Sequence, residues 1–149
     1  MASTAMSRAE REAFLAGVHV GVISLADGAR GPLTVPIWYG YEPGDDLWII
    51  TDRESRKGKL LVKLDRFSLC AQTETAPYKY VSVEGPIVAL ERADVERHTR
   101  VLAHRYLGKE AGDGYIKATG AGSARDESIV IRMRPERWLT VDYAKAFGG

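Results

Sequence analysis

A short basic segment of the chain combines the residue types that bind a phosphate group. Between two apolar stretches, residues 47–50 and 60–64, the sequence reads Thr51-Asp52-Arg53-Glu54-Ser55-Arg56-Lys57-Gly58-Lys59. A strand that ends at Thr51 and a helix that begins near Arg56 would bring unpaired N–H groups and the positive end of a helix dipole to one corner. Arginine and lysine add charge-assisted hydrogen bonds, and the hydroxyls of Thr51 and Ser55 can donate further ones. The segment therefore predicts a site for a phosphate-bearing cofactor.

The same segment has a simpler interpretation. Runs of charge at the start of a surface helix are commonly just solvated, and short motifs match by chance at a high rate. The choice between the two depends on whether the rest of the chain offers a surface for the remainder of a cofactor.

Aromatic residues and a proline gather just before the basic segment. The aromatic residues are Trp38, Tyr39, Tyr41 and Trp48. They can fill a hydrophobic core or wall a flat conjugated ring, and the sequence supports both interpretations equally. Pro36, in the run Pro36-Ile37-Trp38, has no N–H group, so a neighbouring carbonyl in an adjacent strand is left unpaired. A ring with polar edges could bind such exposed backbone groups.

Other kinds of chemistry are not indicated. His19, His98 and His104 are not spaced with cysteines or acids as a zinc site requires, so we expect no metal ion. Cys70 lies in an apolar stretch and is interpreted as an inert buried thiol. The sequence has no P-loop, no dinucleotide-binding glycine motif and no nucleophile elbow. No catalytic residue can be named from these motifs.

The composition fits one small domain in a reducing compartment. The chain has 149 residues and a formal net charge of +1, so the electrostatic footprint of a nucleic-acid or anionic-membrane binder is missing. A single cysteine excludes an internal disulfide and favours the cytoplasm. No secretory signal and no bilayer-spanning segment is expected. We expect a disordered N-terminus over residues 1–6 and one domain over residues 7–149.

A mainly β fold with a few helices would position these residues. Ser7 and Glu10 form a capping-box pattern, and Gly17 ends the helix that it predicts. Helices are expected at 7–16, 56–63 and 95–107, and strands at 18–26, 32–42, 47–51, 66–73, 78–90 and 128–141. Hairpin turns indicate antiparallel pairing, and a bend at Gly85-Pro86 would let six strands close into a small barrel. The glycine-rich segment 108–126 is expected to be irregular.

The order of these motifs resembles a known superfamily. The runs Thr34-Val35-Pro36-Ile37-Trp38-Tyr39, Leu47-Trp48-Ile49-Ile50-Thr51, Ser55-Arg56-Lys57-Gly58-Lys59-Leu60-Leu61 and Tyr80-Val81-Ser82-Val83-Glu84-Gly85 are similar to those of the split β-barrel flavoproteins, the superfamily of pyridoxamine 5′-phosphate oxidase. Within it, the chain looks most like the actinobacterial flavin/deazaflavin oxidoreductases of the B group, which use coenzyme F-420. The resemblance covers roughly residues 7–138 and implies a six-stranded antiparallel FMN-binding split β-barrel, mainly β with flanking α-helices.

The resemblance also assigns cofactor-binding residues. Thr51 and Lys57 match the phosphate-binding positions, and Ser55, Arg56 and Lys59 flank them. Pro36, Ile37 and Trp38 match the strand that lies along the ring. Ile50 matches a position near the ring edge. Leu60 stands where many relatives have asparagine, so a polar contact there is not carried over. Residues 134–149 have no convincing counterpart of the substrate-binding signature of the vitamin-B6 oxidase.

The implied function is that of an oxidoreductase that binds coenzyme F-420 and transfers hydride to a conjugated small-molecule acceptor. The anionic tail of coenzyme F-420 would suit the surplus of cations in and near the basic segment, namely Arg53, Arg56, Lys57, Lys59 and Lys63. The alternatives are an FMN-dependent oxidase or reductase of the same fold, and a non-catalytic cofactor- or haem-binding protein. The family also implies a homodimer with the cofactor at the subunit interface. The proton donor is not identified, although Tyr41, Lys79 and Tyr80 are donors in the strands.

Overall fold

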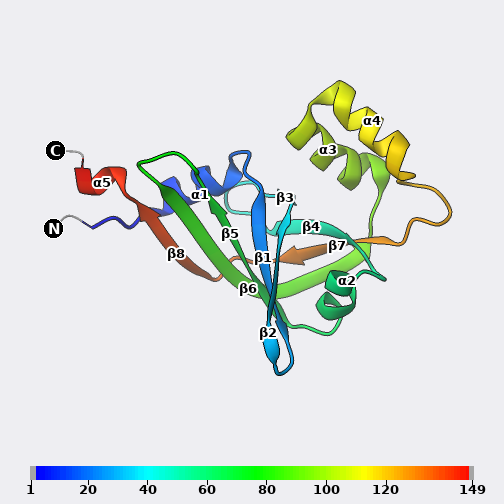
Figure 1. Ribbon diagram of the computed structural model, residues 1–149, viewed down its shortest axis with the longest axis horizontal. Helices are drawn as coiled ribbons and strands as arrows, with labels where there is room; N and C mark the ends of the chain where they lie inside the picture. The colour runs from blue at the N-terminus through cyan, green and yellow to red at the C-terminus, as the bar shows by residue number, and fades with distance from the viewer. Residues whose placement is uncertain (1–2, 148–149) are drawn as a thin grey trace.

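A strongly curled antiparallel sheet forms the body of the protein (Figure 1). The computed structural model describes residues 3–147. The strands are β1 (Gly21–Asp27), β2 (Arg30–Ile37), β3 (Tyr39–Gly40), β4 (Leu47–Asp52), β5 (Arg66–Gln72), β6 (Lys79–Arg92), β7 (Ser128–Met133) and β8 (Arg137–Asp142). They follow the order β2-β1-β5-β6-β7-β4-β3, and β8 pairs with β6. The architecture is that of a split β-barrel, as expected.

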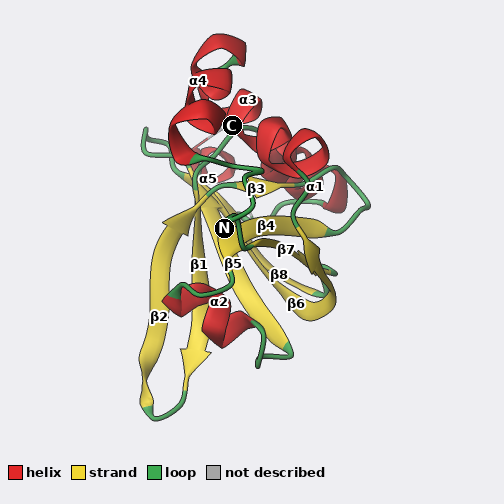
Figure 2. Ribbon diagram, turned by 90° about the vertical axis from the view of Figure 1, so that its right-hand side faces the viewer, coloured by secondary structure: helices red, strands yellow, loops and turns green. Residues whose placement is uncertain are grey.

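Helices pack around the sheet. They are α1 (Arg8–Ala16), α2 (Arg56–Leu61), the π-helical turn η1 (Val95–Thr99), α3 (Arg100–Leu107), α4 (Lys109–Thr119) and α5 (Ala144–Phe147). Figure 2 shows α1, α3 and α4 at one end of the molecule and the turn of the β1–β2 hairpin at the opposite end. None of the helices within residues 3–147 has the length and apolar character to cross a bilayer.

Strand β6 produces the curl. Residues 80–86 pair with β5, whereas from Ile87 onward the strand pairs with β7. The change of partner falls at the bend expected from Gly85-Pro86. A Cβ atom at Gly85 would lie 1.8 Å from the carbonyl oxygen of Arg134, so only glycine allows the crossing chain to approach this closely.

The two faces of the sheet differ in character. The inner face carries fully buried aliphatic side chains such as Ile23, Leu69 and Val83, which form the core. Strand pairing places a second row of residues on the outer face: Pro36, Val22, Cys70, Ser82 and Leu139 on β2, β1, β5, β6 and β8. No element within residues 3–147 covers this outer row as a buried layer, because Pro36 and Leu139 are exposed and the three residues between them are partly exposed.

The N-terminal helix matches its sequence pattern. Ser7 Oγ accepts a hydrogen bond from the Glu10 amide, and Glu10 Oε1 accepts one from the Ser7 amide, which completes the capping box. Residues 1–2 of the expected disordered N-terminus lie outside the described residues. Residues 3–6 instead run beside β8, where the Met6 amide donates to Thr140 Oγ1 over 2.9 Å and Thr4 O accepts from the Asp142 amide.

Three expectations about the elements are corrected. Within residues 3–147 the sheet has eight strands rather than six, because Trp38 separates β2 from β3 and the kink at residues 134–136 divides the predicted strand 128–141 into β7 and β8. Both of these halves lie along the same edge of β6. The segment 108–126, expected to be irregular, contains α4, and the predicted helix 95–107 begins with a π-helical turn.

Candidate functional site

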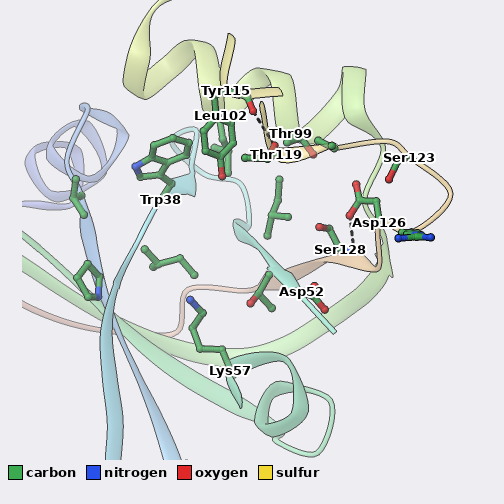
Figure 3. Close-up of a pocket in the computed structure, with 18 residues that line it drawn as sticks. Trp38, Asp52, Lys57, Thr99, Leu102, Tyr115, Thr119, Ser123, Asp126 and Ser128 are labelled. Atoms are coloured by element: carbon green, nitrogen blue, oxygen red, sulfur yellow. Dashed lines mark hydrogen bonds between the residues drawn. The ribbon is translucent and has the colours of Figure 1, made fainter. Parts of the chain in front are cut away.

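A cavity of about 560 Å³ lies where the ends of β2 and β4 meet α2, α3 and α4 (Figure 3). Its wall on the sheet side comes from β2, β4, the start of β7 and the first turn of α2. The opposite wall comes from η1, α3, α4 and the loop that follows α4. The lining residues are Val20, Pro36, Ile37, Trp38, Ile50, Thr51, Asp52, Lys57, Thr99, Leu102, Tyr115, Thr119, Gly120, Ala121, Ser123, Arg125, Asp126 and Ser128.

Hydrogen bonds fix the corner between β4 and α2. Ser55 is the N-cap of α2: its Oγ accepts from the Gly58 amide at 3.0 Å and donates to the carbonyl oxygen of Asp52 at 2.6 Å. Thr51 Oγ1 lies 3.1 Å from Ser55 Oγ, and the residue is 7% exposed. Lys57, in the first turn of α2, points into the cavity (Figure 3). Its ammonium group and the Thr51 hydroxyl therefore face one region.

Gly58 is required for this corner to close. A Cβ atom at this position would lie 2.1 Å from the carbonyl oxygen of Asp52 and 2.8 Å from that of Arg53. The backbone that ends β4 therefore packs directly on the α2 backbone. This contact holds Lys57 beside Thr51.

Trp38 forms an aromatic wall at the break between β2 and β3. Its ring stacks on Tyr106 with a centroid distance of 5.1 Å and an interplanar angle of 4°, and it lies 5.2 Å from the tilted ring of Tyr115. Tyr106 is itself held by its hydroxyl, which donates to His19 O at 2.7 Å and accepts from the Tyr39 amide at 3.2 Å. Helix α3 is thereby fastened to the β2–β3 break.

Tyr39 belongs to the core rather than to the cavity. It is fully buried, and its hydroxyl donates to Leu15 O at 2.7 Å. Burial raises the pKa of Tyr39 above its ordinary value, so the phenol stays protonated. Of the four aromatic residues weighed from the sequence, Trp38 lines the cavity, whereas Tyr41 is also buried and Trp48 packs edge-on against His98.

A partly exposed acidic contact joins the two helices of the opposite wall. Asp113 Oδ1 lies 2.6 Å from both His104 Nε2 and Arg100 Nη1, and these bonds connect α4 to α3. The hydrogen bond from His104 and then that from Arg100 lower the pKa of Asp113, which favours its ionised form. The α3–α4 pair therefore presents Leu102 and Tyr115 to the cavity as one unit.

The loop after α4 closes one end of the cavity. Asp126 accepts hydrogen bonds from the Gly122 amide at 2.8 Å and the Ser128 amide at 2.9 Å, which gives the loop a defined shape. Arg125 lines the cavity from this loop and makes no ion pair within residues 3–147.

The cavity collects part of the predicted cofactor-binding set. Pro36, Ile37, Trp38, Ile50, Thr51 and Lys57 line it. Ser55 does not line it but caps α2 and contacts Thr51. Arg56 is turned away toward the β1–β2 hairpin, where it forms an ion pair with Asp27. Lys59 is exposed on α2 and lies outside the lining.

The predicted surplus of cations does not gather at the cavity. Of the five positively charged residues in and near the basic segment, Lys57 alone is among the lining residues, and Arg125 is an additional cation from a distant loop. The donors named from the strands also lie elsewhere: Tyr41, Lys79 and Tyr80 are not among the lining residues, and Lys79 approaches Asp142. No group of three potential metal ligands occurs within residues 3–147.

Sequence reasoning missed the helical wall of the cavity. Thr99, Leu102, Tyr115, Thr119 and Arg125 belong to it. Leu102 and Tyr106 fall in the helix predicted for residues 95–107, but a predicted helix does not reveal what it packs against. Tyr115 and Thr119 lie in the segment that was expected to be irregular, so no signal placed them near Trp38.

Comparison with known proteins agrees with this architecture. Residues 7–142 match the pyridoxamine 5′-phosphate oxidase family. Among solved structures, the chain is similar to a conserved hypothetical protein, Rv2991, of Mycobacterium tuberculosis, with 20% identity, a TM-score of 0.74 and coverage of 100% of this chain and 92% of the other. It is also similar to an F420 reductase, with 16% identity, a TM-score of 0.69 and coverage of 86% and 94%.

A third similar structure is that of an FAD-binding protein of Mesorhizobium loti, with 18% identity, a TM-score of 0.59 and coverage of 91% of this chain and 94% of the other. At these identities the three structures show a shared fold. No curated protein sequence matches the chain at a significant level.

Proposed function

The chain belongs to the pyridoxamine 5′-phosphate oxidase family, and we propose that it is an oxidoreductase that binds coenzyme F-420 and reduces a conjugated small molecule. One observation carries the proposal: a single cavity joins the hydroxyl and ammonium groups of Thr51 and Lys57 to the chain around Trp38. The hydroxyl and ammonium groups suit a phosphate, and the chain around Trp38 suits a planar ring. Neither feature alone would distinguish a cofactor site from a solvated surface.

Each part of the cofactor has a matching part of the wall. Lys57 would hold the phosphate by a charge-assisted hydrogen bond, and Thr51 would add a second bond by turning its hydroxyl hydrogen from Ser55 Oγ to the phosphate. Ile50 and the backbone of residues 36–38 would lie along the ring. Trp38 lies between β2 and β3 and takes part in no strand pair, so its backbone groups are not committed to the ladder. A bound deazaflavin supplies a two-electron hydride donor, and the protein positions it.

Arg125 favours F-420 over FMN. The two cofactors share a tricyclic ring, a ribityl chain and a phosphate, but F-420 continues into a lactyl and glutamyl tail that carries further negative charge. Lys57 suffices for one phosphate, whereas Arg125 adds a second cation, without an ion-pair partner in residues 3–147, on the same cavity. The similar F420 reductase structure agrees with this choice. An FMN-dependent enzyme of the same fold is the runner-up, in line with the similar FAD-binding protein.

We further propose a homodimer with the cofactor at the subunit interface, in the cytoplasm. The outer sheet face offers small side chains, Val22, Cys70 and Ser82, across three adjacent strands. Pro36 belongs both to this face and to the cavity lining. A second copy seated on the face would therefore border the cavity. The free thiol of Cys70 fits a reducing compartment.

Titration of the purified protein with F-420 and with FMN tests the binding site. We expect F-420 to bind more tightly, and we expect Lys57→Ala to weaken its binding by about 10- to 150-fold, which corresponds to about 1.5–3 kcal/mol for a charge-assisted contact. Lys59→Ala is the matched control, because this neighbouring lysine lies outside the cavity lining. The affinity of this variant for F-420 should equal that of the wild type. Equal losses in both variants would contradict the site, and tighter FMN binding would favour the runner-up.

Turnover separates an enzyme from a carrier or a haem-binding protein. Reduced F-420 should be oxidised in the presence of an enone as the acceptor gains a hydride at carbon and a proton from solvent. The measurement is the absorbance of oxidised F-420 over time. Tight binding without any acceptor-dependent oxidation would indicate a non-catalytic cofactor-binding protein.

A further inference from the structure

The π-helical turn η1 brings the side chain of Thr99 to the cavity. In this turn the Arg100 amide donates to Val95 O, five residues back, and the Thr99 amide lies 3.3 Å from Asp94 O in the same spacing. Such turns are rare and are frequently found at functional sites. Thr99, the last residue of the turn, lines the cavity from the side opposite the sheet (Figure 3).

His98 holds the turn in this conformation. The residue is 4% exposed, its Nδ1 accepts from the Asp94 amide at 2.9 Å, and its ring packs edge-on against Trp48. Burial lowers the pKa of His98, which favours the neutral ring that can accept this bond. The next residue, Thr99, is therefore placed by a packed neighbour rather than by its own contacts.

The hydroxyl of Thr99 has no partner. Its Oγ1 is buried and makes no hydrogen bond within residues 3–147. A buried hydroxyl that has lost its water without gaining another partner destabilises the fold. Threonine in a helix has two accessible χ1 rotamers, so a rotation can move the hydroxyl to a second staggered position without moving the backbone.

The surroundings of Thr99 define what it can bind. Leu102, Tyr115 and Trp38 make this part of the cavity apolar and flat-sided. The other threonine hydroxyl on the helical side, Thr119 Oγ1, already donates to Tyr115 O at 2.8 Å. In the free protein the Thr99 oxygen is shielded from solvent, so other atoms of the residue line the cavity, and a χ1 rotation is needed to turn its unused donor toward the apolar and aromatic walls.

From this placement we propose that Thr99 recognises the substrate: its hydroxyl donates a hydrogen bond to the carbonyl oxygen of a flat, conjugated carbonyl compound bound between Trp38 and Leu102. The proposal rests on the proposed function, because the cofactor occupies the sheet side and leaves the helical side for the acceptor. It narrows the hydride-accepting substrate to molecules that carry a hydrogen-bonding oxygen on an otherwise apolar, planar body. A molecule of this shape without the oxygen would leave the hydroxyl unpaired.

The first test is the stability of the protein without ligand. Thr99→Val keeps the shape of the side chain and removes the unpaired hydroxyl, so Tm should rise by roughly 2–4 °C. Thr140→Val is the matched control, because Thr140 Oγ1 accepts a bond from the Met6 amide and its loss should lower Tm. A fall in the Tm of Thr99→Val would show that the hydroxyl has a partner in the free protein and would overturn the inference.

The second test compares two ligands of similar shape by quenching of tryptophan fluorescence. Benzylideneacetone carries a conjugated carbonyl group, and 1-phenyl-1-butene lacks the oxygen. The wild type should bind the ketone about 5- to 10-fold more tightly, Thr99→Ser should keep this preference, and Thr99→Val should bind both ligands equally. An unchanged preference in Thr99→Val, or no preference in the wild type, would overturn the inference.

These measurements test the role of Thr99 separately from the cofactor titration, which tests the proposed function. Binding of F-420 with no ketone preference would remove the role of Thr99 and leave the proposed function standing. A ketone preference that depends on Thr99 in a protein that binds neither F-420 nor FMN would support a carbonyl-binding cavity and remove the oxidoreductase assignment.

Discussion

Tyr106 fixes the aromatic wall of the cavity through a single hydroxyl group. The group bonds both His19 O and the Tyr39 amide while the ring stacks on Trp38. Tyr106→Phe keeps the ring but leaves a backbone donor and a backbone acceptor unpaired in a partly buried place. We expect a loss of about 1–3 kcal/mol in the free energy of unfolding, measured by urea denaturation.

The matched control is a tyrosine without such bonds. Tyr78 is 52% exposed, and its hydroxyl makes no hydrogen bond to the residues that the structure describes, so Tyr78→Phe should change stability by no more than about 0.5 kcal/mol. Equal effects of the two substitutions would show that the hydroxyl of Tyr106 does not hold α3 on the β2–β3 break.

Two helical glycines should respond in opposite directions to the same substitution. Alanine favours a helix over glycine by about 0.8–1 kcal/mol. At Gly114 in α4 a Cβ atom meets nothing within 4 Å, so Gly114→Ala should stabilise the protein by up to that amount. At Gly58 the Cβ atom would lie 2.1 Å from Asp52 O, so the backbone of β4 or α2 would have to move. Gly58→Ala should therefore destabilise the protein by about 1–3 kcal/mol and weaken F-420 binding.

Thermal unfolding and cofactor titration of both variants provide the measurement. A stabilised Gly58→Ala protein would mean that the strand β4 and helix α2 can separate at no cost. The position of Lys57 would then not depend on their direct backbone contact.

Local signals predicted the elements on the sheet side of the cavity and the helix over residues 95–107, but they missed α4 on the helical side. The start of α2 was expected near Arg56, and the structure shows that Ser55 caps it, which is a contact within three residues of the chain. Helix α4 carries Gly112 and Gly114, which lower its intrinsic helix propensity, so its sequence resembles a loop. Its stability comes from packing on α3, where Gly112 allows close approach to Ala103, and that contact is not visible in local sequence.

The same limit applies to the site. Thr51 and Lys57 were predicted together because they are neighbours in the chain. Tyr115 and Arg125 reach the cavity only through the fold, and they lie more than sixty residues from Thr51 in sequence. The kink at residues 134–136 was also missed, since it becomes necessary only where the Arg134 backbone crosses Gly85.

At the scale of the whole molecule, the outer sheet face is the surface through which two copies should associate. Its central row has small side chains on β1, β5 and β6, which lets another flat surface approach closely. Ser82 lies in this row between Cys70 and Leu139 and points away from the core, so Ser82→Arg should leave the fold intact. We expect the wild type to be a dimer by sedimentation and Ser82→Arg to be a monomer with weakened F-420 binding, because Pro36 links the face to the cavity.

A control with the same added charge separates loss of the interface from a general effect of charge. Ala13→Arg places an arginine on the exposed side of α1 and should leave the dimer and its cofactor affinity unchanged. If Ser82→Arg is monomeric and binds F-420 with wild-type affinity, the site is complete within one subunit. A Ser82→Arg protein that remains dimeric would require another face, since an arginine in this row would hold two sheets apart and leave its charge buried without a partner.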